Sequence, residues 1–127
     1  MVRALLLTLL VASCAPPAQR FHGTYEYGLE HDRFREEGRQ YRDDWGWCMS
    51  QESWELLQAP DTPRGVLHIG KLELTFEAEL SPYGRYGHNG QCEREIRITR
   101  LIEQRHIGFE CAVEPSACER FARGEMN

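Results

Sequence analysis

Apolar and polar side chains alternate without a break in Lys71-Leu72-Glu73-Leu74-Thr75-Phe76-Glu77-Ala78-Glu79-Leu80. A period of two predicts a β-strand with one buried face. Upstream, Leu67 and Ile69 have the opposite phase, and the phase changes at Gly70. One extra residue at a glycine predicts a β-bulge, which bends a sheet as a small closed barrel requires.

Other segments before this stretch also have strand-like patterns. Aromatic side chains alternate from Phe21 to Leu29, and Phe34 then breaks the phase. This strand is therefore expected to end or bend near residues 32–33. Residues 35–44 are polar and predict a loop, and residues 45–49 form a short aromatic segment that carries Cys48.

Two further strands are expected after the glycine- and tyrosine-rich segment 81–91. Within that segment, Asn89-Gly90 predicts a type I′ turn. Apolar side chains recur over residues 96–102 and alternate over residues 107–113. The two runs together are too long for one ordinary strand, so a bend is expected near residues 103–105.

Two short helices are expected as well. Ser50 is a candidate N-cap for a helix over residues 51–58, which Pro60 would end. Ser116 and Glu119 have the spacing of a capping box, so a short C-terminal helix is expected. The side chains expected to hold these helices on the core are Trp54, Leu56, Leu57, Cys118 and Phe121. Five strands and two short helices around one core predict a mainly β fold, a small OB-like five-stranded barrel, with a β-sandwich as the alternative.

The N-terminal segment has the features of a bacterial export signal. Arg3 is followed by an apolar run over residues 4–11, which is too short to span a bilayer. Val11-Ala12-Ser13-Cys14 matches the lipobox of bacterial lipoproteins. The resemblance implies that residues 1–13 are a cleaved signal peptide and that Cys14 carries a covalently attached lipid. The fatty acids of that lipid would include palmitate. Residues 14–20 would then be a lipidated tether and residues 21–127 a single domain.

The alternative is an ordinary secretory signal cut after Ala15 or Ala18. Pro16 and Pro17 lie beside these positions and make both sites poor. The residue that follows Cys14 is Ala15 and not an aspartate. In a lipoprotein this indicates export to the outer membrane, if the host has one. The expected location is the bacterial cell envelope, with the domain facing the periplasm and the membrane as partner through the lipid.

Charge and cysteine content restrict the partners and the chemistry. The net charge of −5 argues against binding of nucleic acid or anionic lipid headgroups. With Cys14 lipidated, four cysteines remain, which predicts two disulfides with three possible connectivities. The preferred pairing is Cys48 with Cys92 and Cys111 with Cys118, because the last two are near in sequence and flank a turn.

A second resemblance concerns the mature domain. Phe21-His22-Gly23-Thr24-Tyr25-x-x-Gly28-x-Glu30, then Phe34-Arg35 and Tyr86-Gly87-His88-x-Gly90, are similar to motifs of small proteobacterial lipoproteins with OB-like domains. In those proteins a cysteine follows Phe-Arg, whereas Glu36 stands here, so their disulfide pairing does not carry over. The family is largely without known activity, so the resemblance implies a fold and leaves the function open.

No pattern for catalysis or for a cofactor is present in the sequence. The serines lack a nucleophile elbow, and the even cysteine count favours oxidation of Cys48 over a catalytic role. The histidines lack metal-ligand spacing, and the cysteines include no C-x-x-C. We therefore expect neither an enzyme nor a bound metal.

Aromatic residues in two segments are the candidate ligand site, because such side chains bury much area and have few torsions to fix. The candidate residues are Trp45, Trp47, Tyr83, Arg85, Tyr86 and His88. The expected function is a non-catalytic binding or interaction module, and another envelope protein is a candidate partner. The alternatives are an inhibitor of a periplasmic or cell-wall hydrolase of the lysozyme type and a metal-binding envelope sensor.

Overall fold

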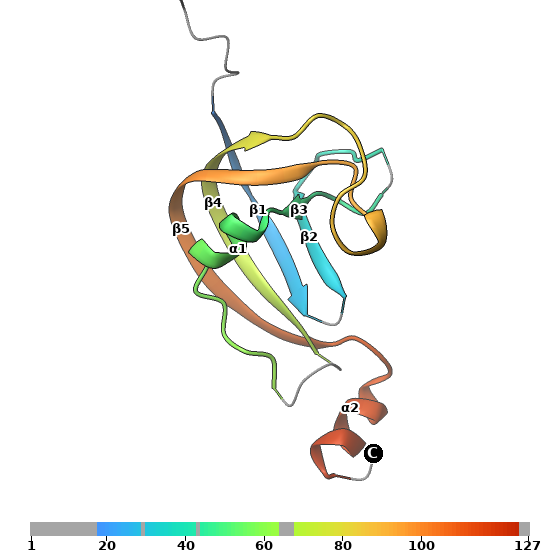
Figure 1. The fold of residues 1–127 in the computed structure, drawn as a ribbon. Coiled ribbons are helices and arrows are strands. Elements are labelled where there is room, and N and C mark those ends of the chain that lie inside the picture. The colour runs from blue at the N-terminus through green and yellow to red at the C-terminus, as the bar shows by residue number, and fades with distance from the viewer. Residues whose placement is uncertain (1–17, 29, 43, 64–67, 125–127) are drawn as a thin grey trace, which may run out of the picture.

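The computed structural model describes residues 18–28, 30–42, 44–63 and 68–124. Five strands form one curved sheet that wraps around a single core (Figure 1). The strands are β1 (Gln19–Gly28), β2 (His31–Glu36), β3 (Cys48–Met49), β4 (His68–Leu80) and β5 (Glu95–Cys111). The helices are α1 (Gln51–Leu56), α2 (Pro115–Ala122) and a single 3-10 turn, η1 (His88–Gly90). Among the described residues, no helix is long and apolar enough to cross a bilayer.

The sheet is nearly closed into a barrel. The hydrogen-bonded order is β2-β1-β4-β5-β3, and β3 pairs in parallel with the start of β5. Phe34 and Trp47 join the two ends of this order, because each backbone N–H donates to the other residue's carbonyl oxygen, at 2.7 and 3.1 Å. The strand order around the barrel is therefore β1-β2-β3-β5-β4 and back to β1, with α1 between β3 and β4. The prediction of a small OB-like barrel is confirmed.

The side chains of β1 face the core and the solvent in the order that the sequence predicted. Phe21, Tyr25 and Tyr27 are buried and belong to the core, while His22 between them is exposed. The strand begins at Gln19, two residues before the expected start. Leu29, the last residue of the predicted alternation, lies outside the described residues.

The chain after β1 differs from the expectation. The first strand was expected to end or bend near residues 32–33, but these residues lie inside β2, which runs antiparallel to β1 as far as Glu36. The reversal comes earlier, because Gly28 pairs with His31 and Glu30 has a positive φ of 57°. Phe34 breaks the phase in the sequence because it belongs to a second strand.

The predicted bulge at Gly70 is wrong in its position. β4 is continuous, and the three shifts of register place the extra residues on β5, at Thr99, Ile102 and Ile107. Gly70 instead faces the ring of Tyr27, where an added Cβ would lie 2.2 Å from Cζ of the ring. Leu67 lies outside the described residues.

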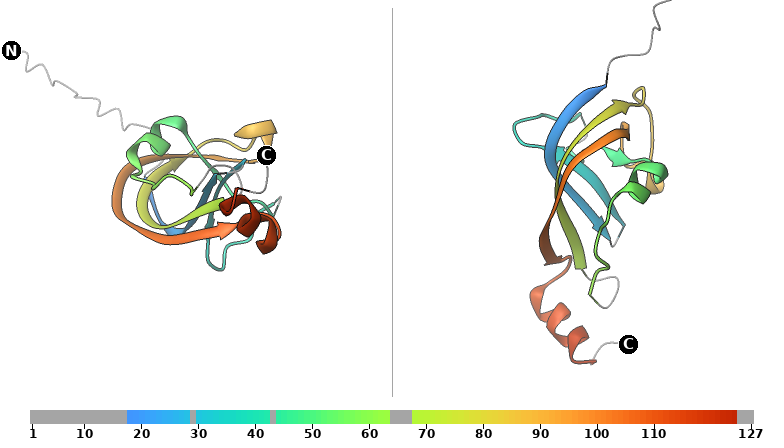
Figure 2. Two further views of the ribbon diagram at one scale, coloured as in Figure 1. Left: turned by 90° about the horizontal axis from the view of Figure 1, so that it is seen from below. Right: turned by 90° about the vertical axis from the view of Figure 1, so that its left-hand side faces the viewer.

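β5 is one strand of 17 residues, where two strands separated by a bend were expected. Its three extra residues let it curve along the whole of β4 (Figure 2). Its second half has fewer neighbours, so Ile102, Ile107 and Phe109 are exposed although the pattern predicted an inward face.

Phenylalanine side chains form the centre of the core. Phe21, Phe34 and Phe76 are at most 1% exposed, and the ring centroids of Phe34 and Phe76 lie 4.9 Å apart. Leu72 and Leu74 of β4 and Ile96 of β5 are also fully buried in this cluster.

The helices agree with the sequence in part. Ser50 caps α1 by accepting a hydrogen bond from Ser53 N, as predicted, but the helix ends at Leu56, which is exposed. Pro115 occupies the first position of α2, so Ser116 lies inside the helix and the predicted capping box is absent. Figure 2 shows α2 projecting from one end of the barrel.

Candidate functional site

The predicted site residues do not converge on one exposed patch. Trp47 belongs to the core, where its ring packs against Phe21 and Tyr41. Trp45 is half-buried, its ring lies beside that of His31 at a tilt of 41°, and the guanidinium of Arg33 lies over its ring. The two tryptophans separate because Gly46 between them has a φ of +123° and turns the chain.

The residues of the loop between β4 and β5 are spread out. Tyr83 is exposed and lies between two guanidinium groups, those of Arg42 at 3.6 Å and Arg94 at 4.5 Å from its ring centroid. Tyr86 is half-buried, and its hydroxyl donates to the carbonyl oxygen of Pro82. The loop is therefore held both by its own Tyr86–Pro82 hydrogen bond and by Arg42, which lies between β2 and β3.

The tip of the same loop carries His88 and Arg85. His88 Nε2 lies 3.5 Å from a carboxylate oxygen of Glu30, and both side chains are exposed. The predicted type I′ turn is present, because Asn89 and Gly90 have positive φ and Gln91 N donates to His88 O. Arg85 is exposed and packs beside Gly90. No group of three or more potential metal ligands occurs within the described part of the chain.

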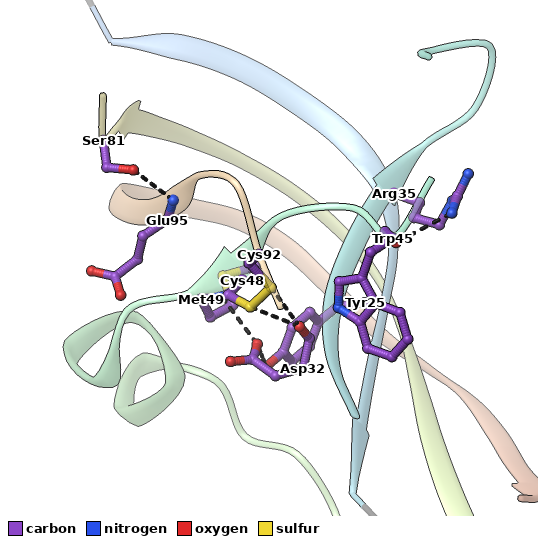
Figure 3. The surroundings of a disulfide bond; sticks show 9 residues. All are labelled: Tyr25, Asp32, Arg35, Trp45, Cys48, Met49, Ser81, Cys92 and Glu95. Atoms are coloured by element: carbon purple, nitrogen blue, oxygen red, sulfur yellow. Dashed lines mark hydrogen bonds between the residues drawn. A yellow bond between two sulfur atoms is a disulfide. The ribbon is translucent and has the colours of Figure 1, made fainter. Parts of the chain in front are cut away.

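Both disulfides have the expected connectivity. Cys48 pairs with Cys92 across a Cα–Cα distance of 5.7 Å, and Cys111 pairs with Cys118 across 6.1 Å. The first links β3 to the segment before β5 (Figure 3). Gly87 packs directly on this disulfide. The second links the end of β5 to α2. Cys14 lies outside the described residues.

A different group of side chains surrounds a cavity of about 360 Å³ beside the β1–β2 hairpin. Its walls come from β1, β2, β3, α1 and the segment that follows α1. That segment is attached on both sides, because Tyr27 Oη donates to Pro60 O at 2.5 Å and Gln58 N donates to Gln104 Oε1 at 3.1 Å. The lining residues are Tyr25, Tyr27, Gly28, His31, Asp32, Met49, Gln51, Trp54, Ala59, Pro60, Asp61 and Thr62.

Three aromatic rings form one side of this cavity. The ring centroids of Tyr25 and Trp54 lie 6.2 Å apart, and those of Tyr27 and Trp54 lie 5.3 Å apart. Tyr25 and Tyr27 stack at 6.5 Å, because residues two apart on a strand share one face. The rings pack against one another and therefore form a rigid wall.

Asp32 contributes a carboxyl group to the cavity wall. Its Oδ1 accepts hydrogen bonds from Tyr25 Oη at 2.6 Å and from Met49 N at 3.0 Å. Oδ2 receives no hydrogen bond from the described residues. Burial raises the pKa of Asp32 above its ordinary value, and the two hydrogen bonds offset part of that rise.

The same environment raises the pKa of both tyrosine hydroxyls. For Tyr25 the main cause is burial, with the charge of Asp32 and its hydrogen bond as further causes. For Tyr27 burial again comes first and the charge of Asp61 second. Both hydroxyls therefore remain protonated at neutral pH and act as donors.

Comparison with protein-family models, with curated proteins and with solved structures finds no significant match to this chain.

The sequence contained part of the signal for this cavity. The alternation of β1 predicts that Tyr25 and Tyr27 face inward, and the predicted helix buries Trp54. The sequence did not predict that Asp32 lines the cavity, because the direction of its side chain depends on where the Gly28–His31 hairpin reverses the chain.

The raised pKa of Asp32 predicts a specific dependence of stability on pH. The carboxyl group of Asp32 holds its proton more tightly in the native state than in the unfolded chain. Ionisation of Asp32 therefore lowers the free energy of unfolding as pH rises from about 4 through the folded-state pKa. An asparagine side chain at this position can keep both hydrogen bonds through its own Oδ1 and carries no charge. We therefore expect Asp32→Asn to be more stable than the wild type at pH 7, with the difference shrinking as pH falls toward 4. Urea unfolding of both chains between pH 4 and pH 7 measures this difference in the free energy of unfolding. A difference that grows toward acid pH would contradict a raised pKa for Asp32.

Proposed function

We propose that this chain is a lipid-anchored protein of the bacterial envelope whose barrel binds a small molecule without catalysing a reaction on it. The observation that carries the proposal is the cavity of about 360 Å³ lined by three aromatic rings and Asp32. Binding sites for small molecules are concave and combine aromatic side chains with a few placed polar groups. The two disulfides support an oxidising compartment such as the periplasm.

Anchoring rests on the lipobox-like Val11-Ala12-Ser13-Cys14. In cells fed a palmitate analogue, we expect the wild-type chain to carry the label and to enter the detergent phase with the membranes. Cys14→Ala removes the thiol that accepts the lipid, so the label should disappear completely. Cys111→Ala is the matched control and should keep it. A Cys14→Ala variant that still carries the label would contradict the anchor.

Binding can be tested independently of anchoring. Ala59 lines the cavity and is half-buried, so Ala59→Phe places a ring in the cavity space. A panel of small amines, alcohols and carboxylates is screened by thermal shift on the wild-type chain and on this variant. The proposal predicts at least one compound that raises Tm in the wild type and has no effect on Ala59→Phe. A panel in which no compound stabilises the wild type, or in which both chains respond equally, would contradict it.

A further inference from the structure

Among the described residues, acidic side chains outnumber lysine and arginine in the lining of the cavity. Asp32 and Asp61 line it together with His31, and no lysine or arginine among the described residues does so. Asp32 makes no ion pair with any described residue, since its hydrogen-bond partners are Tyr25 Oη and Met49 N. This contrasts with the outer face of the sheet, where Glu77 pairs with Arg20 and Arg100 and Glu73 pairs with Arg105.

The carboxylate of Asp32 has capacity for another donor. Tyr25 and Met49 both donate to Oδ1, and Oδ2 receives no hydrogen bond from the described residues. An ionised carboxylate provides about four acceptor sites, so further N–H groups can be accepted there. Burial already disfavours the negative charge, and a bound cation would compensate it.

The aromatic wall adds a second attraction for a cation. The faces of tyrosine and tryptophan rings carry negative potential, and cations bind against them. Tyr25, Tyr27 and Trp54 lie within 6.5 Å of one another by ring centroid and line the same cavity as Asp32. Met49 contributes an apolar and polarizable surface to the same wall.

From this arrangement we infer that the cavity binds a small protonated organic amine. Its N–H groups would donate to Asp32 Oδ2, and its hydrocarbon part would pack against Tyr25, Tyr27 and Trp54. The inference rests on the proposed function and specifies the chemical class of the ligand. A cavity of about 360 Å³ has room for about ten groups of the size of a water molecule or a methylene.

The test compares three compounds of equal chain length with different head groups: n-pentylamine, 1-pentanol and pentanoate. Each is titrated into the full chain in mild detergent at pH 7.5 and followed by calorimetry, with the heat of empty micelles subtracted. We expect the amine to bind at least about tenfold more tightly than the alcohol, because an ionic hydrogen bond is stronger than a neutral one. Pentanoate should bind more weakly than the alcohol, because its negative charge would lie next to the carboxylate of Asp32.

Asp32→Asn distinguishes the carboxylate from the rest of the cavity. The amide can keep both bonds to Oδ1, so the fold should persist, which circular dichroism checks. We expect this variant to lose the preference for the amine while 1-pentanol binding changes by less than about twofold. Asp44→Asn is the matched control, because Asp44 is exposed and does not line the cavity. It should bind the amine as the wild type does.

Each outcome separates the inference from the proposed function. Equal binding of amine and alcohol, or amine binding that survives Asp32→Asn, overturns the amine assignment and leaves the cavity as a ligand site. If the amine binds, and its binding is lost in Asp32→Asn and in Ala59→Phe, the result supports both the ligand site and the amine assignment. If neither these compounds nor any compound of the wider panel bind, both are overturned.

Discussion

Replacing Phe34 by alanine is expected to lower the free energy of unfolding by about 3–5 kcal/mol, the range measured for loss of a buried phenylalanine. Phe34 is 0% exposed and packs against Phe21 and Phe76. Its backbone also makes the two hydrogen bonds to Trp47 that close the barrel. The cavity left by alanine would therefore lie at the closure itself, where the surrounding strands have little freedom to collapse.

Phe109→Ala is the matched control for this change, since the same atoms are removed from a side chain that is 36% exposed. Its expected cost is below about 1.5 kcal/mol, because less apolar area is lost from the interior. Urea unfolding of the full chain followed by tryptophan fluorescence measures both variants. Equal losses for the two variants would contradict the placement of Phe34 at the centre of the core.

Removal of the Cys48–Cys92 disulfide by a double substitution to alanine is expected to cost about 4 kcal/mol. The bond joins residues 44 positions apart, and a longer loop constrains the unfolded chain more strongly. Both cysteines are 1% exposed, so the substitution also removes packed sulfur atoms next to Gly87.

The second disulfide provides the comparison, because Cys111 and Cys118 are only 7 positions apart. Their double substitution should cost about 2.5 kcal/mol on the same chain-entropy model. Urea unfolding of the two double variants under identical conditions gives the order. A larger loss for the Cys111–Cys118 pair would contradict this account of how the barrel is stabilised.

Periodicity predicted those parts of the fold in which one strand face is covered along its length. In β1 and β4 the alternating side chains face the core as expected, because other strands and α1 enclose that face. The same kind of pattern misled in the second half of β5. Ile107 and Phe109 alternate in sequence, but they stay exposed because fewer elements cover this part of the strand.

Other differences arise from backbone geometry that composition does not specify. The extra residues of β5 are Thr99, Ile102 and Ile107, and none of them is a glycine that would mark a bulge in advance. The candidate ligand site shows the same limit. Tyr25 and Tyr27 were predicted to face inward, whereas the role of Asp32 depends on where the hairpin reverses the chain.

We propose that the binding barrel belongs to an exported, lipid-bearing and oxidised chain. Intact mass spectrometry of the protein extracted from bacterial membranes tests this most directly. We predict a polypeptide that begins at Cys14, carries the added mass of a diacylglyceryl group and an amide-linked acyl chain, and lacks four hydrogens because two disulfides have formed. A chain that retains residues 1–13 without lipid, with all its cysteines reduced, would contradict the account.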